Sequence, residues 1–127
     1  MAKISIQQNP TFKQEVDIPR IGGKAEKVSF TFRFLNREQL AAHHQARADY
    51  AKDLSALIQR QDATAADVAK LDADFQFGQL KTILAGWGFD DEFSDDNIRA
   101  LVNESAATAD VIATAFAGAY QKAREGN

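Results

Sequence analysis

The chain of 127 residues contains no cysteine, so a disulfide scaffold and any thiolate-bound zinc or iron–sulfur site are excluded. It has no excess of basic residues either, because 15 Lys and Arg stand against 18 Asp and Glu and the net charge is −3. A general nucleic-acid-binding protein would show a basic excess. No apolar run reaches the length of a membrane span, and the N-terminus has no hydrophobic signal core. We therefore expect an intracellular protein that binds neither nucleic acid nor membrane.

Motifs that carry catalysis are also missing. The sequence has no Gly-x-Ser-x-Gly turn and neither of the glycine-rich phosphate loops, Gly-x-x-x-x-Gly-Lys and Gly-x-Gly-x-x-Gly. The two histidines, His43 and His44, are adjacent. On a helix they point ~100° apart, so they cannot share one metal ion, and we expect one to lie on the surface and one to be partly packed. We expect no enzyme activity, no catalytic residue, and no cofactor or metal.

An acidic run over residues 90–96 invites comparison with a calcium-binding loop. A loop that starts at Asp90 would need glycine at its sixth position and glutamate at its twelfth, where this sequence has Asp95 and Leu101. We interpret the run as the solvated start of a helix. A Mg²⁺ site made of two or three carboxylates is the alternative.

The composition changes sharply near Asn36. Of 23 alanines, 21 follow Asn36, whereas the first 35 residues hold four phenylalanines and both prolines. Strict alternation of apolar and polar residues over positions 28–34 predicts a half-buried strand, and Gly22-Gly23 supplies the positive φ of a tight turn. The pattern predicts a β-hairpin of strands 14–21 and 26–35, with residues 2–8 as a possible third strand.

The remainder predicts helices. Asn36 and Thr64 begin capping-box patterns, which predict one helix that ends near Gln61 and a second that follows Thr64. Glycines on both sides of Trp87 end the second helix, and Ser94 and Ser105 are N-caps for two more. The expected fold is therefore α+β, a single domain over 1–127, mostly α-helical, with a small N-terminal antiparallel β-sheet (1–35) packed on the helical part (36–127).

The second helix carries apolar residues on two opposite faces. At ~100° per residue, the first group of apolar residues lies on one side of the helix and the second group on roughly the opposite side. The first group is Val68, Leu71 and Phe75. The second group is Phe77, Leu80, Ile83 and Leu84. Either the helix breaks near Gly78, or different neighbours cover its two sides. In both cases it is the central element.

The net charge hides a polarised distribution. Residues 1–35 carry a net charge of +3 and residues 90–110 carry −6. Such asymmetry can steer association, which suggests that copies stack head to tail, the basic β part of one against the acidic 90–96 segment of the next. The alternative is that both regions are simply solvated.

The segment Gly86-Trp87-Gly88-Phe89-Asp90-Asp91-Glu92-Phe93, followed by Ser94, Asn97-Ile98 and Leu101, resembles the tail assembly chaperones of long-tailed phages. A short β segment that ends in Phe32-Arg33-Phe34-Leu35-Asn36-Arg37-Glu38-Gln39-Leu40, followed by alanine-rich helices, adds to the resemblance. The similarity covers nearly the whole chain.

The resemblance implies a non-enzymatic role in the cytoplasm of the infected host bacterium. Proteins of this family bind the tape measure protein, keep it soluble, help to recruit tail tube subunits, and are absent from the mature virion. In lambda-like siphophages the family is made as a short form and a frameshifted longer form, whose extra domain engages the tail tube protein. This chain is similar to the short form, and we expect it to self-associate. The alternative is a structural phage protein, a head–tail connector or minor tail component, that stays in the virion.

For partner contacts we single out an aromatic and acidic cluster, because aromatic anchors beside a polar rim are typical of protein interfaces. Its members are Trp87, Phe89, Asp90, Asp91, Glu92 and Phe93. The competing interpretation places Trp87 and Phe93 in the hydrophobic core.

Overall fold

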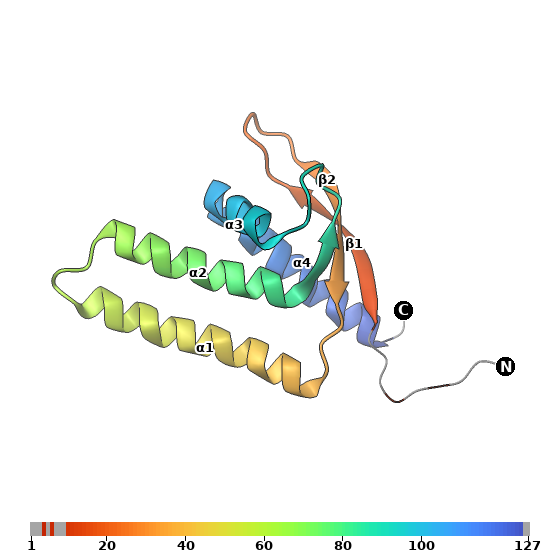
Figure 1. Cartoon of the computed structure of the whole chain (residues 1–127), viewed down its shortest axis with the longest axis horizontal. Coiled ribbons are helices and arrows are strands. Elements are labelled where there is room, and N and C mark those ends of the chain that lie inside the picture. Colours follow the sequence, from red (N-terminus) through yellow and green to blue (C-terminus); the bar gives the residue numbers. More distant parts are fainter. Residues whose placement is uncertain (1–3, 5, 7–9, 126–127) are drawn as a thin grey trace.

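A computed structural model of the chain describes residues 4, 6 and 10–125. A three-stranded antiparallel sheet and two C-terminal helices form the body, and a pair of long helices projects from it (Figure 1). The α+β fold is confirmed. In chain order the elements are β1 (Thr11–Ile18), β2 (Glu26–Arg33), α1 (Arg37–Gln59), α2 (Ala65–Ile83), β3 (Leu84–Trp87), α3 (Asp95–Glu104) and α4 (Ala106–Glu125).

The predicted hairpin is present, with shifted bounds. β1 starts three residues earlier than expected and ends at Ile18, because Pro19 has no N–H to donate to the ladder. The turn contains Gly22 and Gly23 at φ 101° and 88°, a region in which side chains are strained. The possible strand over 2–8 lies, apart from isolated positions, outside the described residues.

The third strand of the sheet comes from the helical part of the chain. β3 follows α2 directly and pairs antiparallel with β2, with Phe30 opposite Trp87 and a register shift between Thr31 and Phe32. The sequence pattern missed this strand because four residues are too short to show alternation. The boundary drawn at residue 36 therefore divides the composition of the chain but not its sheet.

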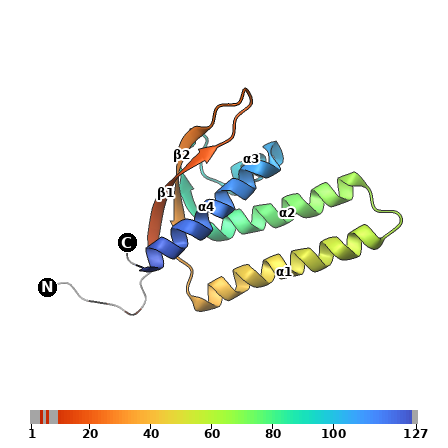
Figure 2. The same ribbon diagram turned by 180° about the vertical axis from the view of Figure 1, so that it is seen from behind.

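One face of the sheet is buried and the other is solvated. Inward side chains on β1 and β2 are apolar and buried, among them Val16, Ile18, Phe30 and Phe32. α4 packs along β1 on this face, and the Tyr120 hydroxyl donates a buried 2.7 Å hydrogen bond to the Leu35 carbonyl (Figure 2). α2, β3, α3 and α4 complete the core with Leu80, Ile83, Leu84, Ile98, Val102, Ala109, Ile112 and Phe116.

α2 is continuous through Gly78 and is covered on two sides by different neighbours, so the second of the two interpretations of its apolar faces is confirmed. On one side Phe75 stacks on Tyr50 of α1, with ring centroids 4.3 Å apart. On the other side Leu80 and Ile83 are fully buried in the body. α2 contacts every other helix as well as β2 and β3. It is the central element of the fold.

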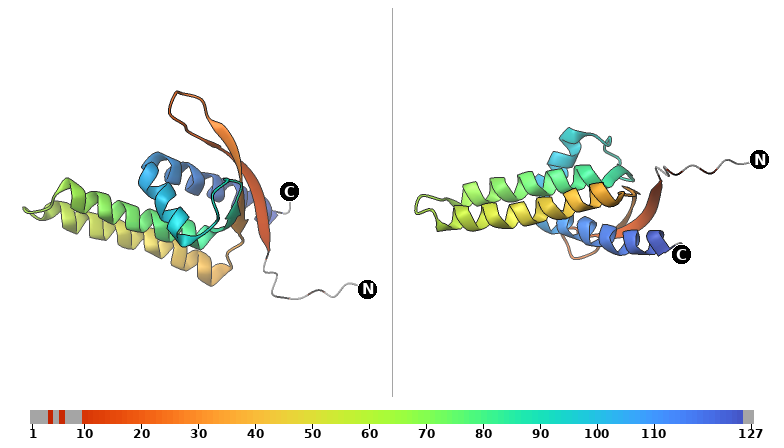
Figure 3. Two further views of the ribbon diagram at one scale, coloured as in Figure 1. Left: turned by 45° about the horizontal axis from the view of Figure 1, so that its top comes forward. Right: turned by 90° about the horizontal axis from the view of Figure 1, so that it is seen from below.

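We call α1, α2 and their connection the helical arm (Figures 1 and 3). Both predicted capping boxes are present, at Asn36 and Thr64, and α1 ends at Gln59. None of the residues of α1 is buried. The Tyr50 hydroxyl donates to the Asp72 carboxylate, and this bond, together with burial, raises the pKa of Tyr50 to about 12. α1 thus rests on α2 through half-exposed side chains.

Candidate partner-binding site

The aromatic and acidic cluster begins at Trp87, the last residue of β3, and continues through the loop between β3 and α3. The loop begins where the Gly88 N–H donates a 2.7 Å hydrogen bond to the Ser29 carbonyl of β2. A Cβ at position 88 would approach that carbonyl oxygen to 3.3 Å, so glycine allows the loop to lie close against the sheet. The pairing of β3 with β2 therefore positions the cluster.

The three aromatic side chains of the cluster pack on one another. Trp87 lies edge-on to both Phe89 and Phe93, with centroid distances of 5.2 and 5.1 Å. Phe89 continues the contact to the buried Phe30 ring at 5.7 Å, and the Trp87 indole N–H donates to the Asp91 carbonyl at 2.9 Å. All three of these rings are half-buried. They hold the loop together and leave only part of their surface available to a partner.

The three acidic side chains point outward. Asp90, Asp91 and Glu92 are exposed, and within the described part of the chain none of them makes an ion pair. The loop backbone beneath them is fixed, because the Asn97 side-chain amide donates to the Glu92 carbonyl at 2.7 Å. Ser94 caps α3, as its spacing predicted. The site is thus a fixed loop with a negatively charged outer surface.

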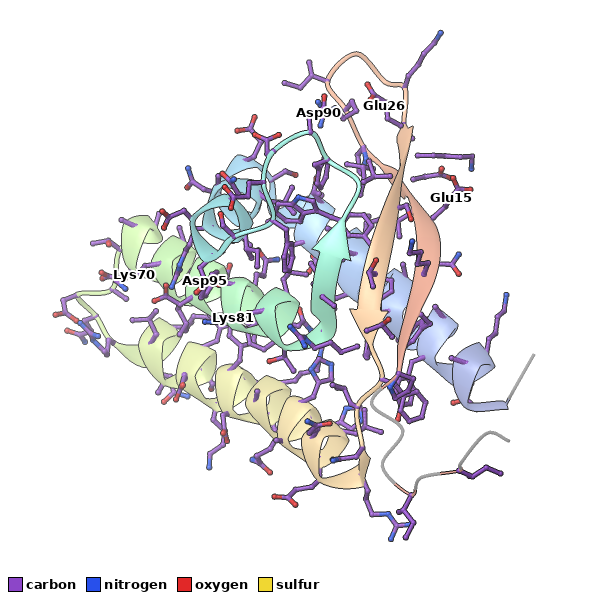
Figure 4. All side chains as sticks on the ribbon, turned by 45° about the vertical axis from the view of Figure 1, so that its right-hand side comes forward. Glu15, Glu26, Lys70, Lys81, Asp90 and Asp95 are labelled. Atoms are coloured by element: carbon purple, nitrogen blue, oxygen red, sulfur yellow. The ribbon has the colours of Figure 1, made fainter. Side chains whose placement is uncertain are left out.

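Two ion pairs within the molecule neutralise charges on either side of this loop. The Lys81 ammonium lies 2.9 Å from the Asp95 carboxylate, and Arg99 pairs with Asp74 at 2.6 Å. Figure 4 shows Asp90 at the outer tip of the loop and Asp95 near the start of α3. The loop starts beside β2, so the acidic segment lies next to the sheet of the same molecule. Head-to-tail stacking of copies, the basic β part of one against the acidic 90–96 segment of the next, stays a prediction.

The histidines do not form a metal site. His43 is half-buried with its ring edge-on to Phe116, 5.8 Å between centroids, whereas His44 is exposed, as the spacing predicted. Burial, followed by the charges of His44 and Arg47, lowers the pKa of His43 below its ordinary value. Across the described residues, no group of three or more His, Asp or Glu side chains could hold a metal ion.

A second candidate surface, which the sequence reasoning missed, is the groove between α1 and α2. It has a volume of about 450 Å³. Its lining is rich in small residues from both helices, and it consists of Gln39, Ala42, His43, Ala46, Asp74, Phe75, Gly78, Gln79 and Thr82. The thin apolar stripe in the first half of α1 was the signal: small side chains there leave space instead of filling it.

The far end of the helical arm is also apolar and accessible. Leu54 and Leu57 are half-buried, and Ile58 is 63% exposed. These residues recur at helical spacing in the sequence, but the structure places no body element against them. None of the helices in the described part of the chain is both long enough and apolar enough to cross a membrane.

A comparison with protein families matched the whole chain to a family model. The family described as phage tail assembly chaperone matches residues 1–127, the whole chain. Neither the comparison with curated proteins nor the comparison with solved structures gave a match.

Proposed function

The chain belongs to the phage tail assembly chaperone family, and on this basis we propose that it binds the tape measure protein and keeps it soluble while the tail is assembled. The observation that carries the proposal is the family match over residues 1–127. A chaperone family is generally non-catalytic, which agrees with the lack of catalytic motifs in the sequence. The protein then acts in the host cytoplasm and is absent from the mature virion.

The helical arm supports binding to a long helical partner. A tape measure protein is a long polypeptide with hydrophobic stripes, and helices of this kind dock into grooves between helices. The small side chains of Ala42, Ala46 and Gly78 allow close approach in the α1–α2 groove. Ile58 extends the apolar surface towards the end of the arm. Many such weak contacts along one tape measure chain would add up through avidity.

The β3–α3 loop offers a second contact of different character. Because its aromatic rings are half-buried against one another, the exposed Asp90, Asp91 and Glu92 are the groups that meet a partner first. Trp87, Phe89 and Phe93 hold these carboxylates in place and present ring edges beside them. We assign the loop to a basic segment of the tape measure protein or, through a longer frameshifted form, to recruitment of the tail tube protein.

Co-expression with the tape measure protein of the same phage tests the proposal. We expect the tape measure protein to be insoluble alone and to become soluble and co-purify when this chain is present. A variant with Ile58→Asp and Gly78→Leu should lose this effect while it remains folded. The variant Glu104→Gln, which changes an exposed carboxylate of α3 outside both surfaces, is the control. A tape measure protein that stays insoluble with the wild-type chain would contradict the proposal.

The protein composition of the virion distinguishes the chaperone role from the alternative role, a head–tail connector or minor tail component. Mass spectrometry of purified virions should find the tape measure and tube proteins but not this chain. Its presence in stoichiometric amounts would favour the structural role.

A further inference from the structure

Among the described residues, β1 is an edge strand with a free row of backbone hydrogen-bonding groups. In the sheet order β1-β2-β3, no strand of the described chain pairs with the outer side of β1. The Phe34 N–H donates to the Pro10 carbonyl at 3.0 Å. Continuing the ladder by alternation, the even-numbered residues of β1 exchange hydrogen bonds with β2. The N–H and C=O groups of Thr11, Lys13, Glu15 and Asp17 therefore point to the free edge.

Two charges on this edge lie opposite uncharged neighbours on β2, although Glu15 is also attracted at longer range by the charge of Lys27. Lys13 and Glu15 are exposed, and on β2 their cross-strand neighbours are the uncharged Thr31 and Ser29. Asp17 differs, because its cross-strand neighbour Lys27 lies 3.1 Å from its carboxylate. Across the described chain, Lys13 and Glu15 take part in no ion pair. Figure 4 shows Glu15 on the outer side of β1.

We propose that β1 pairs antiparallel with β1 of a second copy of this chain, with a two-fold axis at Gln14. This pairing forms one continuous sheet across two molecules, in the manner of strand addition at a sheet edge. It rests on the self-association expected of the chaperone and names the surface that makes it.

The charges select this register. With the axis at Gln14, Lys13 of each copy lies opposite Glu15 of the other, so two ion pairs form on the outer face of the joined sheet. If the two-fold axis moves to residue 13, Lys13 of one copy lies opposite Lys13 of the other. If it moves to residue 15, Glu15 of one copy lies opposite Glu15 of the other. Both put like charges face to face at the axis, which is unfavourable.

The hydrogen bonds and apolar side chains agree with the same register. The N–H and C=O groups of Lys13 on the free edge meet those of Glu15 in the second copy, and those of Thr11 meet those of Asp17. A hydrogen-bonded antiparallel ladder requires this arrangement. On the inner face the half-buried Phe12 comes opposite Val16. In the single chain the Gln14 side-chain amide donates to the Glu15 carbonyl at 3.2 Å. In the dimer a backbone N–H of the second copy replaces it as the donor.

The pairing is expected to be weak and reversible. A single strand edge buries less than the ~1,600 Å² of a standard stable interface. Weak pairing suits a chaperone whose copies gather on one long chain and leave it again, because avidity adds to each contact.

A charge exchange tests the proposal. Lys13→Glu places a glutamate opposite Glu15, and Glu15→Lys places a lysine opposite Lys13, so each variant alone should lose the dimer. Mixed in equal amounts, the two variants restore both ion pairs and should form a heterodimer. Lys24→Glu changes the same charge in the exposed turn and should dimerise like the wild type. Sedimentation equilibrium from about 10 μM to about 1 mM, the range that a weak pairing requires, measures each state.

Amide hydrogen exchange provides a second measurement. The amides of Lys13, Glu15 and Asp17 should exchange more slowly as the protein concentration rises, whereas those of Val16 and Ile18 are already protected by β2 at low concentration.

Oligomers that persist unchanged in both single variants, or no heterodimer in the mixture, would overturn this surface. A wild-type protein that is monomeric up to about 1 mM would overturn it as well. Neither result bears on tape measure binding, which the co-expression experiment measures separately.

Discussion

The indole ring of Trp87 stabilises the β3–α3 loop from inside. It packs edge-on against Phe89 and Phe93, and its N–H satisfies the Asp91 carbonyl. Removing it leaves a cavity and an unpaired carbonyl beside the sheet. The exposed acidic side chains of the same loop contribute little to stability, because they contact mainly water.

We therefore expect Trp87→Ala to reduce the free energy of unfolding by about 2–4 kcal/mol, the lower part of the range for large aromatic deletions because the ring is half-buried. Trp87→Phe keeps most of the ring contact and should cost about 1–2 kcal/mol. Urea denaturation followed by circular dichroism measures both. Asp90→Asn is the control, with an expected change within about 0.5 kcal/mol. A Trp87→Ala protein of unchanged stability would show that the ring serves only as a contact surface.

At the scale of elements, α2 joins the arm to the body. Its second half is buried against the sheet and α3, and its Gln76 side chain donates to the Ala106 carbonyl at 3.2 Å. α2 continues through Gly78 without a break. Nothing lies within 4 Å of the place that the Cβ of a larger residue would occupy there. The glycine weakens the helix and widens the α1–α2 groove.

Gly78→Ala should stabilise the protein by about 0.5–1 kcal/mol, because alanine loses less backbone entropy in a helix than glycine does. Thermal unfolding, with the melting temperature raised, would show it. Gly22→Ala is the matched control: its φ of 101° disfavours any side chain, so this change should destabilise by about 1–2 kcal/mol. If Gly78→Ala destabilises the protein instead, the groove is narrower than the structure shows.

On the scale of the whole molecule, stability is unevenly distributed. The body and the second half of α2 hold nearly all of the buried residues, whereas none of the α1 residues is buried and the far end of the arm extends away from the core (Figure 3). Segments with few buried apolar contacts open locally at a lower free energy than the core. A binding arm of this kind can adapt to a partner without unfolding the body.

We expect amide hydrogen exchange to be faster in residues 50–64 than in β2 or in the second half of α2. Mass spectrometry of peptides from the intact protein measures the difference. Bound tape measure protein should slow exchange in the arm and leave β2 unchanged. Equal protection in the arm and in the body would contradict this distribution.

Local signals in the sequence predicted most of the elements. Asn36, Thr64 and Ser94 act within a single helical turn, and the alternation before Phe34 reflects the two faces of one strand, so neighbouring residues suffice to specify them. The two apolar faces of α2 likewise follow from its periodicity. The order of the aromatic and acidic residues indicated the family.

The tertiary structure alone decided how these elements meet. β3 is a strand because β2 has a second row of N–H and C=O groups to satisfy, a requirement that lies more than fifty residues away in the chain. Pairing of β3 with β2 brings the acidic loop beside the sheet and turns its aromatic rings inward. It also leaves β1 as an edge, where Lys13 and Glu15 form no ion pair within the described chain. Charge and hydrophobicity are properties of the sequence, but which side chains remain available for binding depends on contacts between distant segments.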